Sequence, residues 1–101
     1  MARIRSYQKD LVKSLKNRGE AQAYLNAALE DGDPEVFLLA LRDVAQAQLG
    51  GVGKLAKSSG LNRENLYRML SKKGNPELAS LQTLLEALGF RLSVELNKRA
   101  S

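Results

Sequence analysis

The chain contains no cysteine and no histidine. Without thiolate or imidazole ligands a zinc finger is excluded, and histidine, the commonest general base at neutral pH, is not available for catalysis. A disulfide framework is excluded as well, which fits a protein of a reducing compartment. We therefore expect no metal site, no cofactor and no catalytic residue, and we predict that the protein is not an enzyme.

Long apolar stretches are also missing. The longest apolar run, Val36 to Leu41, is far shorter than the roughly 20 residues that a membrane-spanning helix needs. The N-terminus has no apolar stretch of the kind that marks a signal peptide. We therefore expect a cytoplasmic protein without a membrane partner.

The composition that remains is that of a small soluble domain. Of the 101 residues, 44% are hydrophobic and 27% are charged, which is typical of one globular domain. A chain of this length buries a small core, so pairing with a second subunit would add burial. The net charge of +5 is a weak indication of a polyanionic partner.

The charges are divided into blocks along the sequence. Residues 1–18 hold six basic residues and one acidic residue, residues 19–50 hold one basic and six acidic, and residues 51–76 hold six basic and one acidic. These blocks carry net charges of +5, −5 and +5, and the remainder is neutral. We interpret residues 1–18 as a basic N-terminal segment, residues 19–101 as the folded domain, and residues 51–76 as a candidate phosphate-facing surface.

Apolar residues recur at helical spacing through most of the chain. The clearest helix follows Asp33, which supplies an N-cap oxygen, and begins at Pro34, which suits the first helical position. The expected helical segments are a short turn or two within Lys9 to Asn17, then Glu20 to Glu30, Pro34 to about Gln48, Val52 to Ser59, a helix capped by Asn62 that runs to about Ser71, and a helix capped by Ser80 that Gly89 closes.

After Gly89 the period changes to two. Phe90, Leu92, Val94 and Leu96 alternate with polar residues, which predicts a β-strand over residues 90–97. A single strand needs a partner, and two are open: the same strand of a second subunit across a two-fold axis, which we favour, or residues 3–7. The expected fold class is therefore mostly all-α, with one C-terminal strand.

Small residues fall at regular offsets between the two short central helices. Ala56, Gly60 and Leu66 stand where two closely crossing helices need a small side chain, a left-handed turn and an inward apolar residue. This spacing predicts a helix-turn-helix unit over Val52 to Ser71. The alternative is a plain helical hairpin within a bundle.

The outward face of the second of these helices has side chains that suit base edges. Arginine matches guanine, asparagine matches adenine, and a glutamate can accept a hydrogen bond from cytosine. Glu64 has a second interpretation, because it can pair with Arg68 one helical turn away. The predicted base-reading residues are Arg63, Glu64, Asn65 and Arg68, with Asn62, Tyr67 and Ser71 as additional recognition-helix residues.

Basic residues flank this helix on both sides. Lysines there would neutralise phosphates and fix the position of the protein on DNA without reading sequence, although solvated surface lysines have the same appearance. The predicted phosphate contacts are Gly53, Lys54, Lys57, Lys72 and Lys73, with Gly53 acting through its backbone amide at a helix N-terminus.

Several strings together resemble the lambda-repressor-like helix-turn-helix family, and within it the XRE/HigA-like addiction-module antidote (antitoxin) proteins. The resemblance covers roughly Leu29 to Val94. The strings are Glu30-Asp31-Gly32-Asp33-Pro34, Gly60-Leu61-Asn62-Arg63-Glu64-Asn65-Leu66-Tyr67-Arg68-Met69-Leu70-Ser71, Gly74-Asn75-Pro76 and Leu84-Leu85-Glu86-Ala87-Leu88-Gly89. Many members have a glutamine early in the first motif helix, where this chain has Val52-Gly53-Lys54.

The resemblance implies a compact bundle of about five helices that binds a palindromic DNA operator as a homodimer. It further implies repression of the protein's own two-gene operon and neutralisation of a RelE-like killer ribonuclease. The nearest alternative is a stand-alone phage-type or chromosomal transcriptional regulator without a toxin. More remote alternatives are a small basic ribonuclease and a helical protein-binding adaptor.

The acidic block of residues 19–50 is the candidate surface for such a basic toxin. Its acids gather around helix ends and would complement a cationic nuclease. Alternatively, they stabilise helix N-termini and balance the basic blocks. The residues concerned are Glu20, Glu30, Asp31, Asp33 and Glu35.

Overall fold

A computed structural model describes residues 2–71 and 74–98 of the chain. In these residues the fold is all-α, with six helices and no β-strand. The helices are α1 (Ala2–Ser14), α2 (Arg18–Asp31), α3 (Pro34–Leu49), α4 (Val52–Ser59), α5 (Arg63–Met69) and α6 (Leu78–Ala87). None of them is long and apolar enough to cross a membrane.

The boundary between α2 and α3 forms as the sequence predicts. Gly32 ends α2 with a left-handed φ of 85°, a conformation in which glycine avoids the steric cost of a side chain. The side chain of Asp33 then accepts a 2.9 Å hydrogen bond from the Glu35 amide, and Pro34 occupies the first turn of α3. These few neighbouring residues therefore determine where α2 ends and where α3 begins.

Other boundaries differ from the prediction. The N-terminal helix is longer than the expected turn or two and begins at Ala2. The last helix begins before Ser80, because the Glu77 carbonyl already accepts a 2.9 Å hydrogen bond from the Leu81 amide. Ser80 is therefore inside α6 and is not its cap. At its C-terminal end α5 stops at Met69, two residues before the expected Ser71.

The core is built around α3, which contacts α1, α2 and α4, while α4 in turn contacts α5 and α6. Among the described residues every buried side chain is apolar. Burial of this apolar surface is the main force that holds the helices together. The largest fully buried side chains are Leu15, Leu41, Val44, Leu55, Leu66, Leu70 and Leu84.

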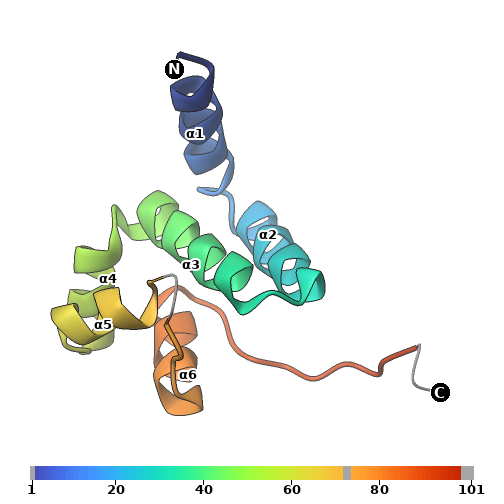
Figure 1. The fold of residues 1–101 in the computed structure, drawn as a ribbon, viewed down its shortest axis with the longest axis vertical. Coiled ribbons are helices and arrows are strands. Elements are labelled where there is room, and N and C mark those ends of the chain that lie inside the picture. Colours follow the sequence, from blue (N-terminus) through green and yellow to red (C-terminus); the bar gives the residue numbers. More distant parts are fainter. Residues whose placement is uncertain (1, 72–73, 99–101) are drawn as a thin grey trace.

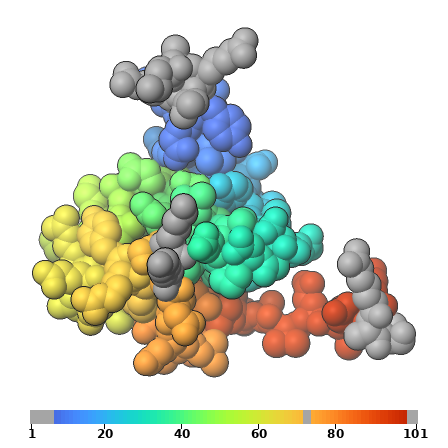
Figure 2. Space-filling view, viewed as in Figure 1, coloured from blue at the N-terminus to red at the C-terminus, as the bar shows by residue number. Residues whose placement is uncertain are grey.

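Two segments project from this body in different directions (Figure 1). Helix α1 extends from one end of α3, and the chain after α6 runs outward as an extended segment toward the C-terminus. The pair α4 and α5 lies on one side of the molecule, and the turn between α2 and α3 lies on the other. The space-filling view shows the same compact centre with the two projections (Figure 2).

The predicted strand over residues 90–97 is not formed within the chain. Phe90 packs against the core and its amide donates a 2.7 Å hydrogen bond to the Leu85 carbonyl. Beyond it the segment is extended, and Leu92, Val94 and Leu96 are 36%, 98% and 97% exposed. One proposed partner, residues 3–7, belongs to α1 and is helical. A strand requires a neighbouring strand for its backbone, and the described chain provides none.

Candidate nucleic-acid interface

Helices α4 and α5 form a compact pair, which we call the α4–α5 unit (residues 52–69). Leu55, Ala56 and Leu66 are buried between the helices and the rest of the core. Gly60 joins the helices with a left-handed φ of 76°. The predicted arrangement of small residue, glycine and inward apolar residue is therefore present. Helix α4 packs against α3 and α6, and α5 packs against α4, which compensates for the low stability of such short helices in isolation.

The start of α5 is fixed by Asn62. Its side-chain oxygen accepts a 3.1 Å hydrogen bond from the Asn65 amide, as predicted for an N-cap. This bond occupies the Asn62 oxygen and sets the direction of the first turn. The exposed side chains that follow are held on a rigid helix end rather than on a loop.

Most side chains of α5 are exposed. Within the helix, Leu66 is fully buried and Met69 is half-buried. Ser71, just after the helix, is half-buried, and its hydroxyl donates a 2.7 Å hydrogen bond to the Arg68 carbonyl. The structure therefore brings the predicted base-reading residues together on one short helix. The exposed side chains are Arg63, Glu64, Asn65, Tyr67 and Arg68.

Arg63 turns back from this surface toward α4. Its guanidinium lies over the Tyr67 ring, 5.6 Å from the ring centroid, which is a cation–π distance. A side-chain carbon added at Gly53 would lie 3.6 Å from the Cζ, Nε and Nη2 atoms of Arg63. The positive charge of Arg63 is therefore beside the first turn of α4, a contact that the sequence did not indicate.

The turn before α4 is made of glycines and lacks a side-chain cap. Gly50 and Gly51 have φ values of 93° and 136°, and Gly51 occupies the N-cap position without a side-chain hydrogen bond. A side-chain carbon at Gly50 would lie 3.3 Å from the Lys54 Nζ. Lys54 and Arg63 therefore lie near the positive end of the α4 dipole.

A groove runs from this turn along α3. We call it the cationic groove and define it by Arg42, residues 50–54, Arg63 and Tyr67 among its lining. Asp43 also lines it, but this carboxylate accepts a 2.7 Å hydrogen bond from the Tyr24 hydroxyl. Three cations thus share one groove. Arg42 was missed in the sequence because it lies within the acidic block.

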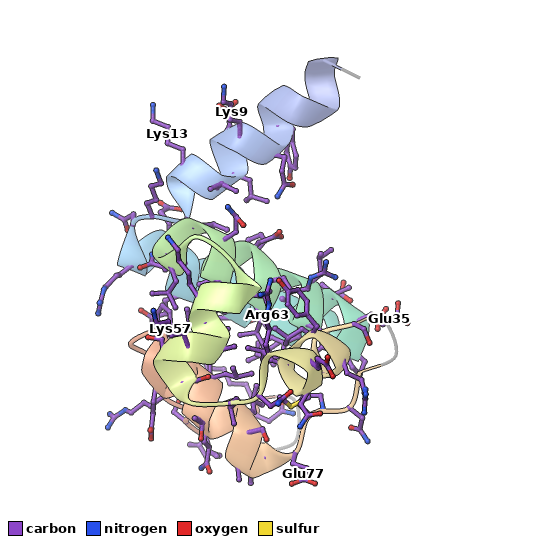
Figure 3. All side chains as sticks on the ribbon, turned by 90° about the vertical axis from the view of Figure 1, so that its left-hand side faces the viewer. Lys9, Lys13, Glu35, Lys57, Arg63 and Glu77 are labelled. Atoms are coloured by element: carbon purple, nitrogen blue, oxygen red, sulfur yellow. The ribbon has the colours of Figure 1, made fainter. Side chains whose placement is uncertain are left out.

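Of the remaining predicted phosphate contacts, the structure describes Lys57 and Gly53. Lys57 is exposed in the last turn of α4. Figure 3 shows Lys57 and Arg63 on the side of the molecule formed by α4 and α5. Lys72 and Lys73 lie outside the described residues. Gly53 is in the first turn of α4, where its amide is part of the uncapped helix end.

Tyr24 and Asp43 fasten the N-terminal helices to α3 beside this groove. Burial raises the pKa of the Tyr24 hydroxyl above its ordinary value, and the hydrogen bond to Asp43 raises it further. The Gln8 amide donates a 3.4 Å hydrogen bond to the other Asp43 oxygen. Gln48 reaches from α3 to the Leu15 carbonyl at 2.6 Å. These contacts position α1 and α2 around α3.

Acidic side chains gather at the opposite end of α3. We define the acidic turn as Glu30, Asp31, Asp33 and Glu35, which surround the junction of α2 and α3. Asp33 caps α3 and Glu35 lies in its first turn, so both stabilise that helix. Glu30 and Asp31 instead lie in the last turn of α2, where a carboxylate faces the negative end of the helix. Helix stability therefore does not explain these two acids.

Possible metal ligands are not clustered in the parts of the chain that the structure describes. No group of three histidine, cysteine, aspartate or glutamate side chains there is arranged to hold a metal ion. Four surfaces of the described chain therefore remain as candidate binding sites: the cationic groove, the α5 surface, the acidic turn and the extended C-terminal segment.

Comparison with known proteins gives a family. A model of the family described as "Probable addiction module antidote protein" matches residues 5–96. A protein of Haemophilus influenzae described as "Uncharacterized protein" is 34% identical over 91 residues, which is 90% of this chain and 92% of that protein. No solved structure matches the chain. The chain therefore belongs to the family of probable addiction module antidote proteins.

Proposed function

We propose that this antidote protein binds double-stranded DNA sequence-specifically and represses transcription of its own operon. The observation that supports the proposal most directly is the exposed α5 surface beside the cationic groove. A helix with polar, hydrogen-bonding side chains suits the major groove, and cations beside it suit the flanking phosphates. In this proposal the α4–α5 unit is a helix-turn-helix of the lambda-repressor-like, XRE/HigA-like type.

The α5 residues divide into two roles. We propose that Arg68, Asn65 and Glu64 contact base edges, because their side chains are exposed on the helix surface. Arg63 was expected to read bases as well, but its guanidinium lies beside Gly53 at the start of α4. From this position a phosphate contact fits it better. Tyr67 would then hold the Arg63 guanidinium by stacking.

Electrostatics support a phosphate at the cationic groove. Arg42, Lys54 and Arg63 outnumber the one carboxylate in the lining, that of Asp43, and the α4 N-terminus adds a further partial positive charge. An anion held by the Gly53 amide and these cations would balance the excess of positive charge. Lys57 would continue the phosphate contacts, and we propose the same role for Lys72 and Lys73 from the sequence.

The family implies a toxin partner. We propose that this toxin is a RelE-like ribonuclease and that the acidic turn binds it. Glu30 and Asp31 are exposed and have no role in stabilising α2. A basic nuclease would complement them. The acidic turn lies on the far side of α3 from α4 and α5, so toxin and DNA would occupy different surfaces (Figure 1).

The protein is proposed to act in the cytoplasm, without enzymatic activity, as a homodimer on a palindromic operator. A two-fold symmetric protein would place two copies of α5 in successive turns of the major groove. In this view residues 1–18 are a basic segment in addition to the DNA-binding domain of residues 19–101.

A reporter gene placed behind the DNA upstream of the protein's own coding sequence tests the repressor function. Expression of the wild-type protein should lower reporter output, and the double variant Asn65→Ala with Arg68→Ala should restore it. Circular dichroism of the purified variant should match that of the wild type because both residues are exposed. A reporter that does not respond to the wild-type protein would contradict the proposal.

Growth of cells that express the product of the neighbouring gene tests the antidote function. Co-expression of this protein should restore growth. If the neighbouring product is harmless, or remains toxic in the presence of this protein, the stand-alone regulator becomes the better interpretation.

A further inference from the structure

The C-terminal segment of residues 90–96 is extended and exposed, yet it has the alternating pattern of a half-buried strand. Val94 and Leu96 are 98% and 97% exposed. Of residues 90–96, Phe90 alone is joined to the rest of the described chain by a backbone hydrogen bond. Isolated extended segments with apolar side chains and open backbone groups are templates for pairing with another chain.

We propose that two copies of this chain pair through residues 90–96 as antiparallel strands, with the two-fold axis at Ser93. This inference rests on the proposed homodimer and assigns its contact residues and register. In this register Arg91 is opposite the partner's Glu95. Leu92 is opposite the partner's Val94. Phe90 is opposite the partner's Leu96.

The charges favour this register over its neighbours. With the axis at Ser93 the symmetry produces two pairs of opposite charge, because each copy supplies one Arg91 and one Glu95. An axis at Leu92 would place Arg91 opposite the partner's Ser93, and both ion pairs would be lost. An axis at Val94 would place Arg91 opposite the partner's Asn97, again without a charge partner. Opposite charges directly across a strand pair stabilise it.

The apolar pattern excludes the intermediate registers. Residues directly opposite each other in an antiparallel pair have their side chains on the same face. An axis between Leu92 and Ser93 would place Arg91 opposite the partner's Val94 and mix charged with apolar residues on each face. With the axis at Ser93, one face is apolar in both strands and the other is polar.

The body of the subunit has a groove beside this segment. Apolar side chains of α2, α3 and the segment line it together with polar residues of the segment: Leu25, Leu29, Phe37, Phe90 and Leu92, with Arg91, Ser93 and Glu95. Leu29 is 53% exposed there. The proposed register brings the exposed Val94 and Leu96 of one copy opposite the groove-lining Leu92 and Phe90 of the other. In the dimer, Val94 and Leu96 of each copy would therefore be partly covered by apolar side chains of the partner subunit.

A second copy fits this segment better than an unrelated strand because the sequence is complementary to its own reverse. Reversal about Ser93 exchanges Arg91 with Glu95 and exchanges apolar residues with apolar residues. A different protein would require neither property. The additional burial also suits a chain whose own core is small.

Charge exchange tests the register in the full chain without DNA or toxin. Sedimentation equilibrium should show a wild-type dimer. The single variants Arg91→Glu and Glu95→Arg each convert two opposite-charge pairs into two like-charge pairs, so the dissociation constant should rise by about tenfold. The double variant Arg91→Glu with Glu95→Arg should return it to within about twofold of the wild type, because both pairs are re-formed with reversed polarity.

Two further variants separate pairing from charge and folding. Glu86→Arg changes the net charge as Glu95→Arg does, but Glu86 lies on the exposed surface of α6 and its replacement should leave the dimer unchanged. Val94→Asp should weaken the dimer at least as much as the single charge variants. The unfolding transition of dilute monomer should be the same in all of them, because Arg91, Val94, Glu95 and Glu86 are exposed in the single chain.

A wild-type protein that remains monomeric at high concentration, or a double variant no better than the single ones, would overturn the inference. These outcomes are distinct from failure of the proposed function. A dimer with this register that does not bind DNA would contradict the repressor and leave the strand pairing intact. A monomer that represses transcription would contradict the homodimer and its strand pairing and leave the repressor function intact.

Discussion

The α4–α5 unit and the C-terminal segment of residues 90–96 both have clear patterns in the sequence, but only the first is completed within the chain. Leu66 of the unit is fully buried, whereas Val94 of the segment is almost fully exposed. The difference is one of available neighbours, since α3 and α6 cover the α4–α5 unit and the described chain supplies no second strand. A periodic apolar pattern therefore predicts that a surface will be buried, and it does not say which chain will bury it.

The largest expected effect is on the free energy of unfolding, which a substitution in the α4–α5 unit should change and one in the C-terminal segment should not. Leu66→Ala removes a fully buried side chain and should lower the free energy of unfolding by about 2–5 kcal/mol. Val94→Ala should leave it unchanged in dilute monomer because the side chain is exposed. Urea unfolding at low protein concentration measures both. A large loss in the Val94 variant would show that the segment is buried within its own chain.

The next effect concerns the exposed surface of the α4–α5 unit, which we propose is covered by bound DNA. Arg68→Ala should weaken operator binding by about 1–3 kcal/mol and relax the preference at one base pair. Competition with operators substituted one base pair at a time measures the change. An Arg68 variant with an unaltered preference at every position would remove this residue from base recognition.

Lys57→Ala provides the matched control for that variant. Its loss should weaken binding evenly across DNA sequences and lower the slope of affinity against salt concentration by about 1, because one phosphate contact is removed. Titrations at several salt concentrations measure the slope. A change in base preference, with an unchanged slope, would contradict the assignment of Lys57 to a phosphate.

The two kinds of acid in the acidic turn should also respond differently. Glu30→Lys with Asp31→Lys should weaken toxin binding by about tenfold or more and leave operator affinity unchanged. Asp33→Ala should instead lower the free energy of unfolding by about 1 kcal/mol, because it removes the α3 cap. Calorimetric titration with the toxin and urea unfolding give the two results. Unimpaired toxin binding by the double variant would contradict the proposal that the acidic turn binds the toxin.

A smaller effect is expected from pH at the contact between Tyr24 of α2 and Asp43 of α3. The folded protein raises the pKa of Tyr24, so this residue favours the folded state below the pH of about 10 at which a tyrosine ionises in the unfolded chain. Above that pH the contribution should decline as pH rises. Unfolding of the wild type and of Tyr24→Phe, compared at pH values on either side of 10, should show a steeper loss in the wild type. Equal losses in both proteins would contradict the assignment.

Local signals predicted much of the fold. Asp33 and Asn62 cap the helices that follow them, and Gly60 has the left-handed conformation that its turn requires. These features depend on a few neighbouring residues, so the sequence contains them. The start of α6 was placed too late because Ser80 is a good cap by type, whereas the backbone hydrogen bond from Leu81 to Glu77 begins the helix earlier.

Contacts between distant residues could not be predicted in the same way. The position of Arg63 beside Gly53 depends on how α5 crosses α4, and the presence of Arg42 in the cationic groove depends on how α3 meets both. The periodicity of a single segment does not indicate which other helix that segment contacts. The partner of the C-terminal segment is harder still to predict, because a second molecule is required to supply it.

Recognition of a particular DNA sequence by the α5 surface can be tested with purified protein. Its binding to DNA from immediately upstream of its own gene is measured in competition with random duplex at fixed salt. We expect a preference above roughly 10³ for the upstream duplex. Equal affinity for both duplexes, or no binding to either, would contradict it and leave capture of a protein partner as the leading function.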